Sequence, residues 1–139
     1  MALKWVLERG EADVQRAFSL LEAYSRQECV LTAPDLLLVE FANVLIAAHR
    51  QEPARAREAL DLLSDTGIRI LAFRRSALNR AVDLAATLRA TVYDCYFLAA
   101  AIESDAVLVT ADEAFLRRVR PHPNTLALRD LGLATSHDD

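Results

Sequence analysis

Three acidic residues lie in stretches of this sequence that otherwise suit a protein core. Glu40 is the only charged residue within residues 36–48, and Asp94 is the only one within residues 90–102. Asp112 follows the apolar run AVLVT by two residues. An ionised carboxylate in apolar surroundings is unfavourable unless it is paired, hydrogen-bonded or protonated. The positions of these acids therefore need a physical explanation.

A divalent cation would explain why the acids are kept. Three carboxylates brought to one cleft repel one another and raise one another's pKa. Mg²⁺ and Mn²⁺ prefer carboxylate oxygen and water, and they leave coordination positions open for phosphate. Such a site activates water and neutralises the charge that develops on a phosphodiester. Glu40, Asp94 and Asp112 are therefore candidate metal ligands and catalytic residues.

Each acid taken alone has a simpler interpretation. It caps a helix, pairs with one of the fifteen arginines, or lies at a solvated edge. For Asp112 the cap is an equally good interpretation, because EAFLRRV follows it directly. For Glu40 and Asp94 these simpler interpretations are weaker, because apolar residues flank each acid on both sides.

Apolar periodicity and turn residues predict helices alternating with short strands. Helices are expected over residues 2–7, 11–28, 34–50, 52–65, 76–90, 91–104 and 111–119, and strands over residues 29–34, 68–73, 106–110 and 125–128. Continuous apolar strands that alternate with helices indicate an α/β fold, with a parallel sheet covered on both faces. Functional residues of such folds gather at the carboxyl ends of the strands, where Asp112 lies.

Composition indicates one globular domain over residues 1–139. The net charge is −4, so a uniformly basic surface for nucleic acid is absent. Cys29 and Cys95 are 66 residues apart without a metal-ligand spacing, which favours a reducing cytoplasm. No apolar run is long enough to predict a membrane span or a signal peptide. The three histidines lack ligand spacing, and no phosphate-binding glycine loop is present.

Four segments, in this order, resemble the signature segments of PIN-domain proteins, particularly the VapC-type toxins: ALKWVL, APDLLLVEFANVL, TVYDCYFLAAAIES and VLVTADEAF. The resemblance runs from residue 2 to about residue 119. It implies a three-layer α/β/α fold whose acidic residues bind Mg²⁺ or Mn²⁺ and cleave RNA. It also implies an antitoxin protein as partner and a homodimer, with no membrane association.

The resemblance assigns roles by position. Glu40 matches the acid of the VEFANVL helix, Asp94 the acid of the YD helix and Asp112 the acid of the TAD turn. Thr110 matches the hydroxyl residue of that turn and is expected to make a positioning contact. Asn43 lies one helical turn after Glu40, where it orients Glu40 or a water, or else bonds to the backbone.

Basic and aromatic residues near these acids have two interpretations each. Arg117 and Arg118 follow the TADEAF turn and would hold the phosphate backbone if they border the acidic cleft. Otherwise they form a solvated helix face. Tyr93 and Tyr96 flank Asp94 and are expected at the core or its rim, with stacking on an RNA base as the alternative.

The family pattern begins with a strand that ends in an Asp, and residue 1 stands where that motif has just finished. A chain truncated in this way lacks the usual first, central strand, so we expect a gapped or oligomer-completed sheet. Three acids in place of four predict weakened metal binding and impaired activity. Residues encoded upstream of Met1 would restore the strand and its Asp.

Two other functions are compatible with an α/β fold of this size. A catalytically impaired PIN-like module could still pair with an antitoxin-like protein, although three retained acids argue against that. A receiver-like regulatory domain needs a lysine after a late strand. Lys4 is the only lysine of the chain, so the receiver hypothesis fails.

Overall fold

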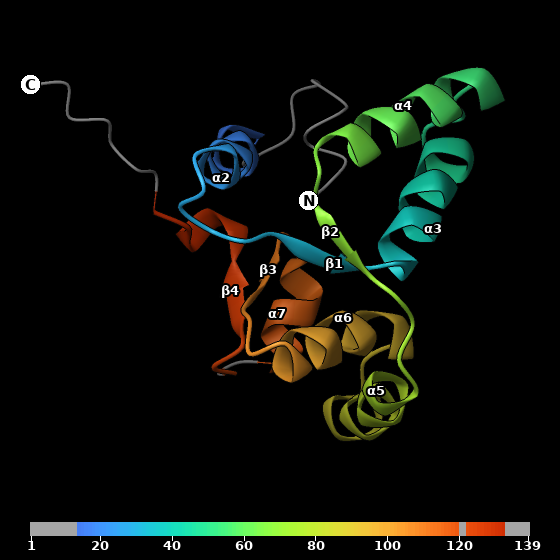
Figure 1. Cartoon of the computed structure of the whole chain (residues 1–139). Helices are drawn as coiled ribbons and strands as arrows, with labels where there is room; N and C mark the ends of the chain where they lie inside the picture. The colour runs from blue at the N-terminus through green and yellow to red at the C-terminus, as the bar shows by residue number, and fades with distance from the viewer. Residues whose placement is uncertain (1–13, 120–121, 133–139) are drawn as a thin grey trace, which may run out of the picture.

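The computed structural model describes residues 14–119 and 122–132. Its elements follow the alternating order expected from the sequence, and helices lie on both sides of the strands (Figure 1). In chain order they are α2 (Val14–Ser25), β1 (Thr32–Pro34), α3 (Leu36–Asn43), η1 (Val44–Ala48), α4 (Pro53–Asp65), β2 (Arg69–Leu71), α5 (Arg75–Leu88), α6 (Val92–Glu103), β3 (Leu108–Thr110), α7 (Glu113–Val119), β4 (Thr125–Ala127) and η2 (Leu128–Asp130). The α/β fold class is confirmed. The helix predicted over residues 2–7 lies outside the described residues.

The strands form two small parallel sheets. β1 pairs with β2, with Ala33 opposite Ile70, and β3 pairs with β4, with Val109 opposite Leu126. Among the described residues no strand joins these two half-sheets. In the described part of the chain the two half-sheets are therefore separate, and β1 and β3 line one cavity.

Helix α6 supports both half-sheets, because it contacts β1 as well as β3. The helix begins with a reciprocal cap, in which the Thr91 hydroxyl oxygen accepts from the Asp94 amide at 3.1 Å. Its apolar sequence is buried on most sides, and the buried residues are Cys95, Tyr96, Leu98, Ala99, Ala100 and Ala101. An all-round apolar helix of this kind is stable only when other elements cover it.

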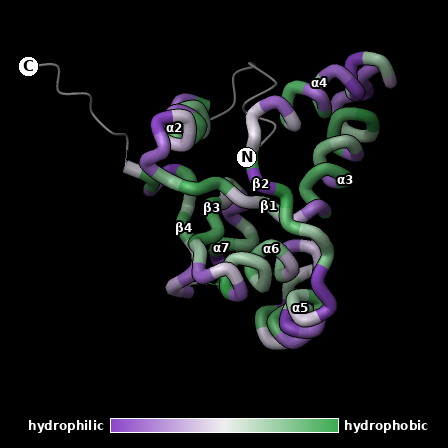
Figure 2. Tube along the Cα trace, in the orientation of Figure 1, coloured by the Kyte–Doolittle hydropathy of each residue, from purple (hydrophilic) through white to green (hydrophobic). Residues whose placement is uncertain are grey.

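Two hydrophobic clusters fill the interior of the described chain. The larger one joins α5, α6 and α7 through Ala77, Ala81, Cys95, Tyr96, Leu98, Ala99, Phe115 and Val119. The smaller one joins α3, η1 and α4 through Phe41, Leu45, Ala56, Ala59 and Leu63. The two helices of the smaller cluster differ in hydropathy. In Figure 2, α3 is mainly hydrophobic, whereas α4 alternates between hydrophobic and hydrophilic residues.

The helix predicted over residues 34–50 is not a uniform α-helix. It continues from α3 into the π-helical turn η1, where the His49 amide donates to the Val44 carbonyl at 3.1 Å. A π-turn inserts an extra residue into a helix and is most frequent near functional sites. Sequence periodicity cannot predict it, because the apolar pattern continues without a break.

No helix in the described part of the chain is long and apolar enough to cross a membrane.

Truncating the centre of the larger cluster should destabilise the fold. We expect Leu98→Ala, at a fully buried position of α6, to lower the free energy of unfolding by about 2–5 kcal/mol, because it removes packed atoms and leaves a cavity. Urea unfolding followed by circular dichroism measures the change. Leu62→Ala, at a position 59% exposed on α4, is the matched control and should change stability by about 0.5 kcal/mol or less. Equal losses in the two variants would contradict the assignment of α6 as the central helix.

Candidate metal-dependent nuclease site

A cavity of about 950 Å³ opens between the two half-sheets. One wall is formed by residues 29–34, which include β1, and the opposite wall by residues 105–112, which include β3. A stripe along α6 lines the cavity between them. Its members Asp94, Phe97, Ala101 and Ser104 are three or four residues apart and so share one face of the helix.

The cavity brings together the three acids that the sequence singled out. Glu40 comes from the middle of α3, Asp94 from the first turn of α6, and Asp112 from the connection between β3 and α7. Burial raises the pKa of Glu40 above its ordinary value, and the charges of Asp94 and Asp112 raise it further. Glu40 is therefore close enough to both aspartates to be repelled by their charges, although the three residues are far apart in the sequence.

Asp94 has a structural role in addition to its place in the cavity. The Thr91 hydroxyl donates to Asp94 Oδ2 at 2.7 Å, while the Asp94 amide donates back to Thr91. A carboxylate in the first turn also interacts favourably with the positive end of the helix dipole. These contacts fix the side chain at the mouth of the cavity, and Asp94 Oδ1 accepts no hydrogen bond from a described residue.

Asp112 likewise caps a helix while it lines the cavity. Its Oδ1 accepts from the Phe115 amide at 2.9 Å at the start of α7, and its own amide donates to Thr110 Oγ1 at 3.1 Å. Thr110 therefore contacts the backbone of Asp112, and its positioning role in the site stays a prediction. The cap interpretation of Asp112 is confirmed, and one carboxylate oxygen remains without a partner among the described residues.

None of the three acids forms an ion pair with an arginine of the described residues. In the part of the chain that the structure describes, no three Asp, Glu, His or Cys side chains lie close enough to enclose a metal ion directly. Mg²⁺ usually keeps several of its waters and binds one or two carboxylates, so a looser acidic set suits it. The donor set thus fits a hydrated hard cation better than a fully enclosed one.

The other predicted site residues lie away from this cavity. Asn43, at the end of α3, is exposed and does not line the cavity. Arg117 and Arg118 are exposed on α7 and do not line it either. Arg118 donates to the Arg89 carbonyl at 2.6 Å and so ties α7 to the end of α5. Their roles in substrate binding stay predictions.

Two other arginines line the cavity. Arg74 lies 3.7 Å from the carboxylate of Glu103 and donates to Ser104 Oγ at 3.3 Å. Arg69 on β2 is exposed, and its guanidinium group has no hydrogen-bond or ion-pair partner among the described residues. The sequence carried a signal for Arg69, since it is the only charged residue in the apolar run IRILAF.

The comparisons with known proteins agree with this geometry. A model of the PIN domain family matches residues 2–120. This chain belongs to the PIN-domain family. No curated protein matches the chain significantly.

Membership of the PIN family has a coarse functional consequence. PIN domains are generally nucleases, commonly metal-dependent ribonucleases. In this PIN domain the acidic cavity gathers carboxylates at the carboxyl end of β3 and at the start of α6.

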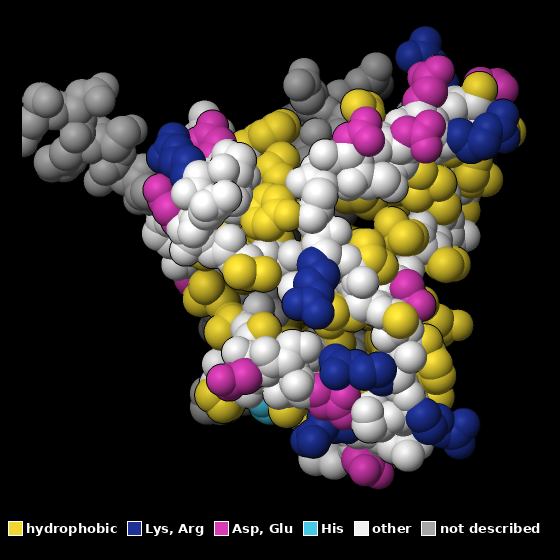
Figure 3. Space-filling view, viewed as in Figure 1, with side chains coloured by type: hydrophobic (Ala, Val, Ile, Leu, Met, Phe, Trp, Pro, Cys, Tyr) yellow, Lys and Arg dark blue, Asp and Glu magenta, His cyan; other side chains and the backbone are white. Residues whose placement is uncertain are grey.

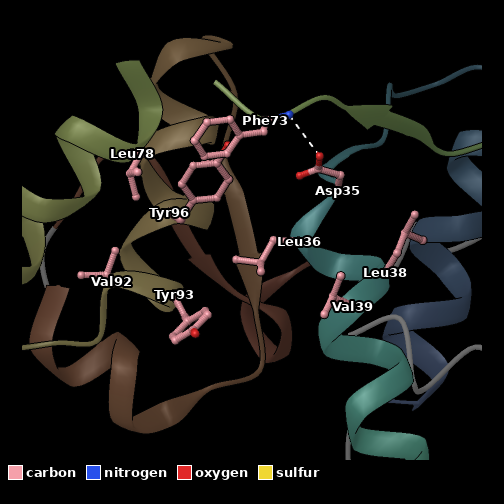
Figure 4. A pocket seen from close by; sticks show the side chains of 9 residues that line it. All are labelled: Asp35, Leu36, Leu38, Val39, Phe73, Leu78, Val92, Tyr93 and Tyr96. Atoms are coloured by element: carbon pink, nitrogen blue, oxygen red, sulfur yellow. Dashed lines mark hydrogen bonds between the residues drawn. The ribbon is translucent and has the colours of Figure 1, made fainter. Parts of the chain in front are cut away.

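A second, apolar pocket of about 720 Å³ opens on another side of α6 (Figure 4). Leu36 of α3 lies across it from Tyr93 and Tyr96. Tyr96 is buried, stacks on Phe73 with ring centroids 6.1 Å apart, and accepts a hydrogen bond from the Arg74 amide. Tyr93 is 71% exposed at the rim, so the core and rim interpretations of the two tyrosines both hold.

The pKa of Glu40 should respond to its neighbours in a definite direction. With a chelator present, we expect Asp94→Asn to lower the pKa of Glu40, because removing a negative neighbour makes its ionised form less unfavourable. Mg²⁺ should lower it further by favouring the ionised form. Carboxyl ¹³C chemical shifts followed through a pH titration measure both effects, and Asp83→Asn on α5 is the control. An unchanged pKa in Asp94→Asn would show that the two carboxylates are not coupled.

Proposed function

We propose that this PIN domain is a metal-dependent endoribonuclease of the VapC type, the toxin of a toxin–antitoxin pair. The observation that carries the proposal is the coupling of Glu40 to Asp94 and Asp112 within one cavity. Carboxylates retained together at an energetic cost, without arginine partners in the described chain, are typical of a cation site.

Each of the three acids has a distinct role in the proposed reaction. Asp94 and Asp112 are held by helix-capping hydrogen bonds, and each offers one free carboxylate oxygen towards Mg²⁺ or Mn²⁺. Glu40, with its raised pKa, accepts a proton more readily than an ordinary carboxylate and orients the attacking water. When bound, the cation activates water and neutralises charge on the phosphodiester.

Arg69 is the best-placed residue for the RNA backbone. It lines the same cavity from β2 and has no competing partner in the described chain, whereas Arg74 is engaged by Glu103. In Figure 3, Lys and Arg side chains lie over the strands in the middle of the face shown. A guanidinium group binds phosphate oxygens in a fork, which positions the substrate without reading its sequence.

Substituting an acid without changing its shape tests the proposal. We expect the chain to cleave a labelled mixed-sequence RNA in Mg²⁺ or Mn²⁺ but not in a chelator, and Asp94→Asn to reduce the rate by about a hundredfold or more. The asparagine oxygen still accepts from Thr91, so the helix cap is kept. Gel analysis of the products over time measures the rate.

Asp83→Asn is the matched control, because Asp83 is exposed on α5 outside the cavity. It should cleave like the original chain. Equal rates in Asp94→Asn, or cleavage that continues in the chelator, would contradict the proposal. So would the absence of both cleavage and Mn²⁺ binding, the latter followed by electron paramagnetic resonance.

Protein pairing is a second candidate function, favoured by the apolar pocket between α3 and α6. Val39 is 67% exposed there, and Phe73 and Tyr93 are exposed as well. An exposed apolar area of this kind is typical of a protein–protein contact. We propose that it holds a second copy of the chain. An antitoxin that reaches the acids could pass along its edge, since Val39 and Tyr93 are the immediate neighbours of Glu40 and Asp94.

The oligomeric mass tests this pairing. We expect a dimer by light scattering at micromolar concentrations, and a shift towards monomer in Val39→Gln because a polar side chain weakens the apolar contact. Val82→Gln, at an exposed valine of α5 outside the pocket, should leave the dimer intact. A monomer at every concentration, or equal effects of the two variants, would contradict pairing through this pocket.

A further inference from the structure

A cluster of charged and hydroxyl side chains lies at the carboxyl end of α6. Glu103, in the last turn, accepts a hydrogen bond from the Ser76 hydroxyl at 3.1 Å. Its carboxylate lies 3.7 Å from Arg74 and 4.0 Å from Arg80, so both ion pairs are longer than a hydrogen bond. The Arg74 guanidinium group also donates to Ser104 Oγ at 3.3 Å. These contacts join the first turns of α5 to the end of α6.

Both arginines of this cluster keep donor groups available for another anion. A guanidinium group carries five N–H donors, and the side chains of Arg74 and Arg80 are 41% and 49% exposed. Partly exposed ion pairs of this length contribute little to stability, because solvent screens them. Glu103 also lies at the negative end of the helix dipole, where a carboxylate is unfavourable. A phosphate group can therefore compete with this carboxylate for the two arginines.

The cluster and the catalytic acids lie at opposite ends of one cavity. Asp94 is in the first turn of α6 and Glu103 is in the last, which places them about 14 Å apart along the helix axis. Both residues line the cavity, together with Arg74 and with Phe97, which lies between the two ends of the helix. On the face shown in Figure 3, Lys and Arg side chains continue from the strands towards α5. The cavity thus has carboxylates at one end and guanidinium groups at the other.

This order of charges suits a nucleic-acid strand that extends beyond the scissile phosphate. A cation held by the acids would bind one phosphate, and the arginines would bind another along the same strand. At about 3.4 Å per stacked nucleotide, the length of α6 between them corresponds to about four nucleotides. A base between the two phosphates would stack on the Phe97 ring. The net charge of the chain is −4, so the basic end of the cavity does not reflect a generally basic protein.

We propose that Arg74 and Arg80 form a second phosphate subsite for the RNA strand, which Glu103 occupies until a phosphate displaces its carboxylate. This inference rests on the proposed ribonuclease function and names a positioning contact for its substrate. Without RNA, the carboxylate offsets the charge of the arginines. When RNA binds, a phosphate oxygen takes the place of the carboxylate and accepts hydrogen bonds from both guanidinium groups.

Removing the competing carboxylate should strengthen RNA binding. We expect Glu103→Gln to bind a labelled mixed-sequence RNA of eight nucleotides about threefold more tightly, because glutamine still accepts from Ser76 but does not neutralise the arginines. Arg80→Gln should weaken binding about threefold. It should also reduce the slope of log affinity against log salt by about 0.7, the value for one phosphate contact on a single strand. Fluorescence anisotropy at several salt concentrations, in a chelator that prevents metal-dependent cleavage, measures these changes.

Two controls separate the subsite from a general effect of charge. Asp105→Asn removes the same charge from a neighbouring position that lines the cavity without an arginine partner among the described residues, so it should change the affinity less than Glu103→Gln. Glu103→Gln should give no gain in a chain that also carries Arg74→Gln and Arg80→Gln. Circular dichroism verifies that each variant is folded, and the salt slope of Arg80→Gln decides the proposal if Glu103→Gln is not.

Equal affinities of Glu103→Gln and the original chain would overturn the proposal, as would an equal gain in Asp105→Asn or a gain that persists without the two arginines. An unchanged salt slope in Arg80→Gln, or RNA binding that is undetectable in every variant at low salt, would overturn it as well. A chain that shows the Glu103 effect but does not cleave RNA in Mg²⁺ or Mn²⁺ retains the subsite and loses the nuclease assignment. A chain that cleaves RNA without the Glu103 effect loses the subsite alone.

Discussion

The burial of α6 is the interaction on which the rest of the molecule depends. One side of this helix packs on α5 and α7, and another side contacts β1 and β3. Because the helix is apolar all round, it must be covered on several sides, and each covering element brings its own termini to it. Glu40, Asp94 and Asp112 line one cavity for this reason, since Asp94 lies on α6, Asp112 follows β3, and Glu40 lies on α3, which contacts β1.

The acidic cavity combines stability and chemistry in the same side chains. Asp94 and Asp112 each give one oxygen to a helix cap and keep the other free. A capping bond contributes about 1 kcal/mol and holds the carboxylate in a single orientation. Glu40 has no such bond in the described chain and carries the raised pKa. The caps fix two acids, and the pKa of the third is raised by burial and by the charges of the other two.

Much of this arrangement follows from the sequence, and what does not follow has physical reasons. The alternation of strands and helices predicted the α/β class. The π-turn at Val44–Ala48 could not be predicted, because it breaks the hydrogen-bond pattern without changing the apolar pattern. The sequence also could not predict which arginine side chains line the cavity. Arg117 and Arg118 follow the acidic turn closely, yet α7 directs them away from the cavity, whereas Arg69 reaches it from a distant strand.

The strands β1 and β3 and the three acids line one cavity, so whatever fills this cavity changes the electrostatics of the acids. Water between β1 and β3 screens the repulsion of Glu40 by its two neighbours. Displacement of this water would strengthen that repulsion and raise the cost of leaving three carboxylates ionised. The same loss of water would strengthen the attraction of a divalent cation for them. Exclusion of water and binding of a cation are therefore expected to favour each other, because the cation removes the repulsion that the loss of water strengthens.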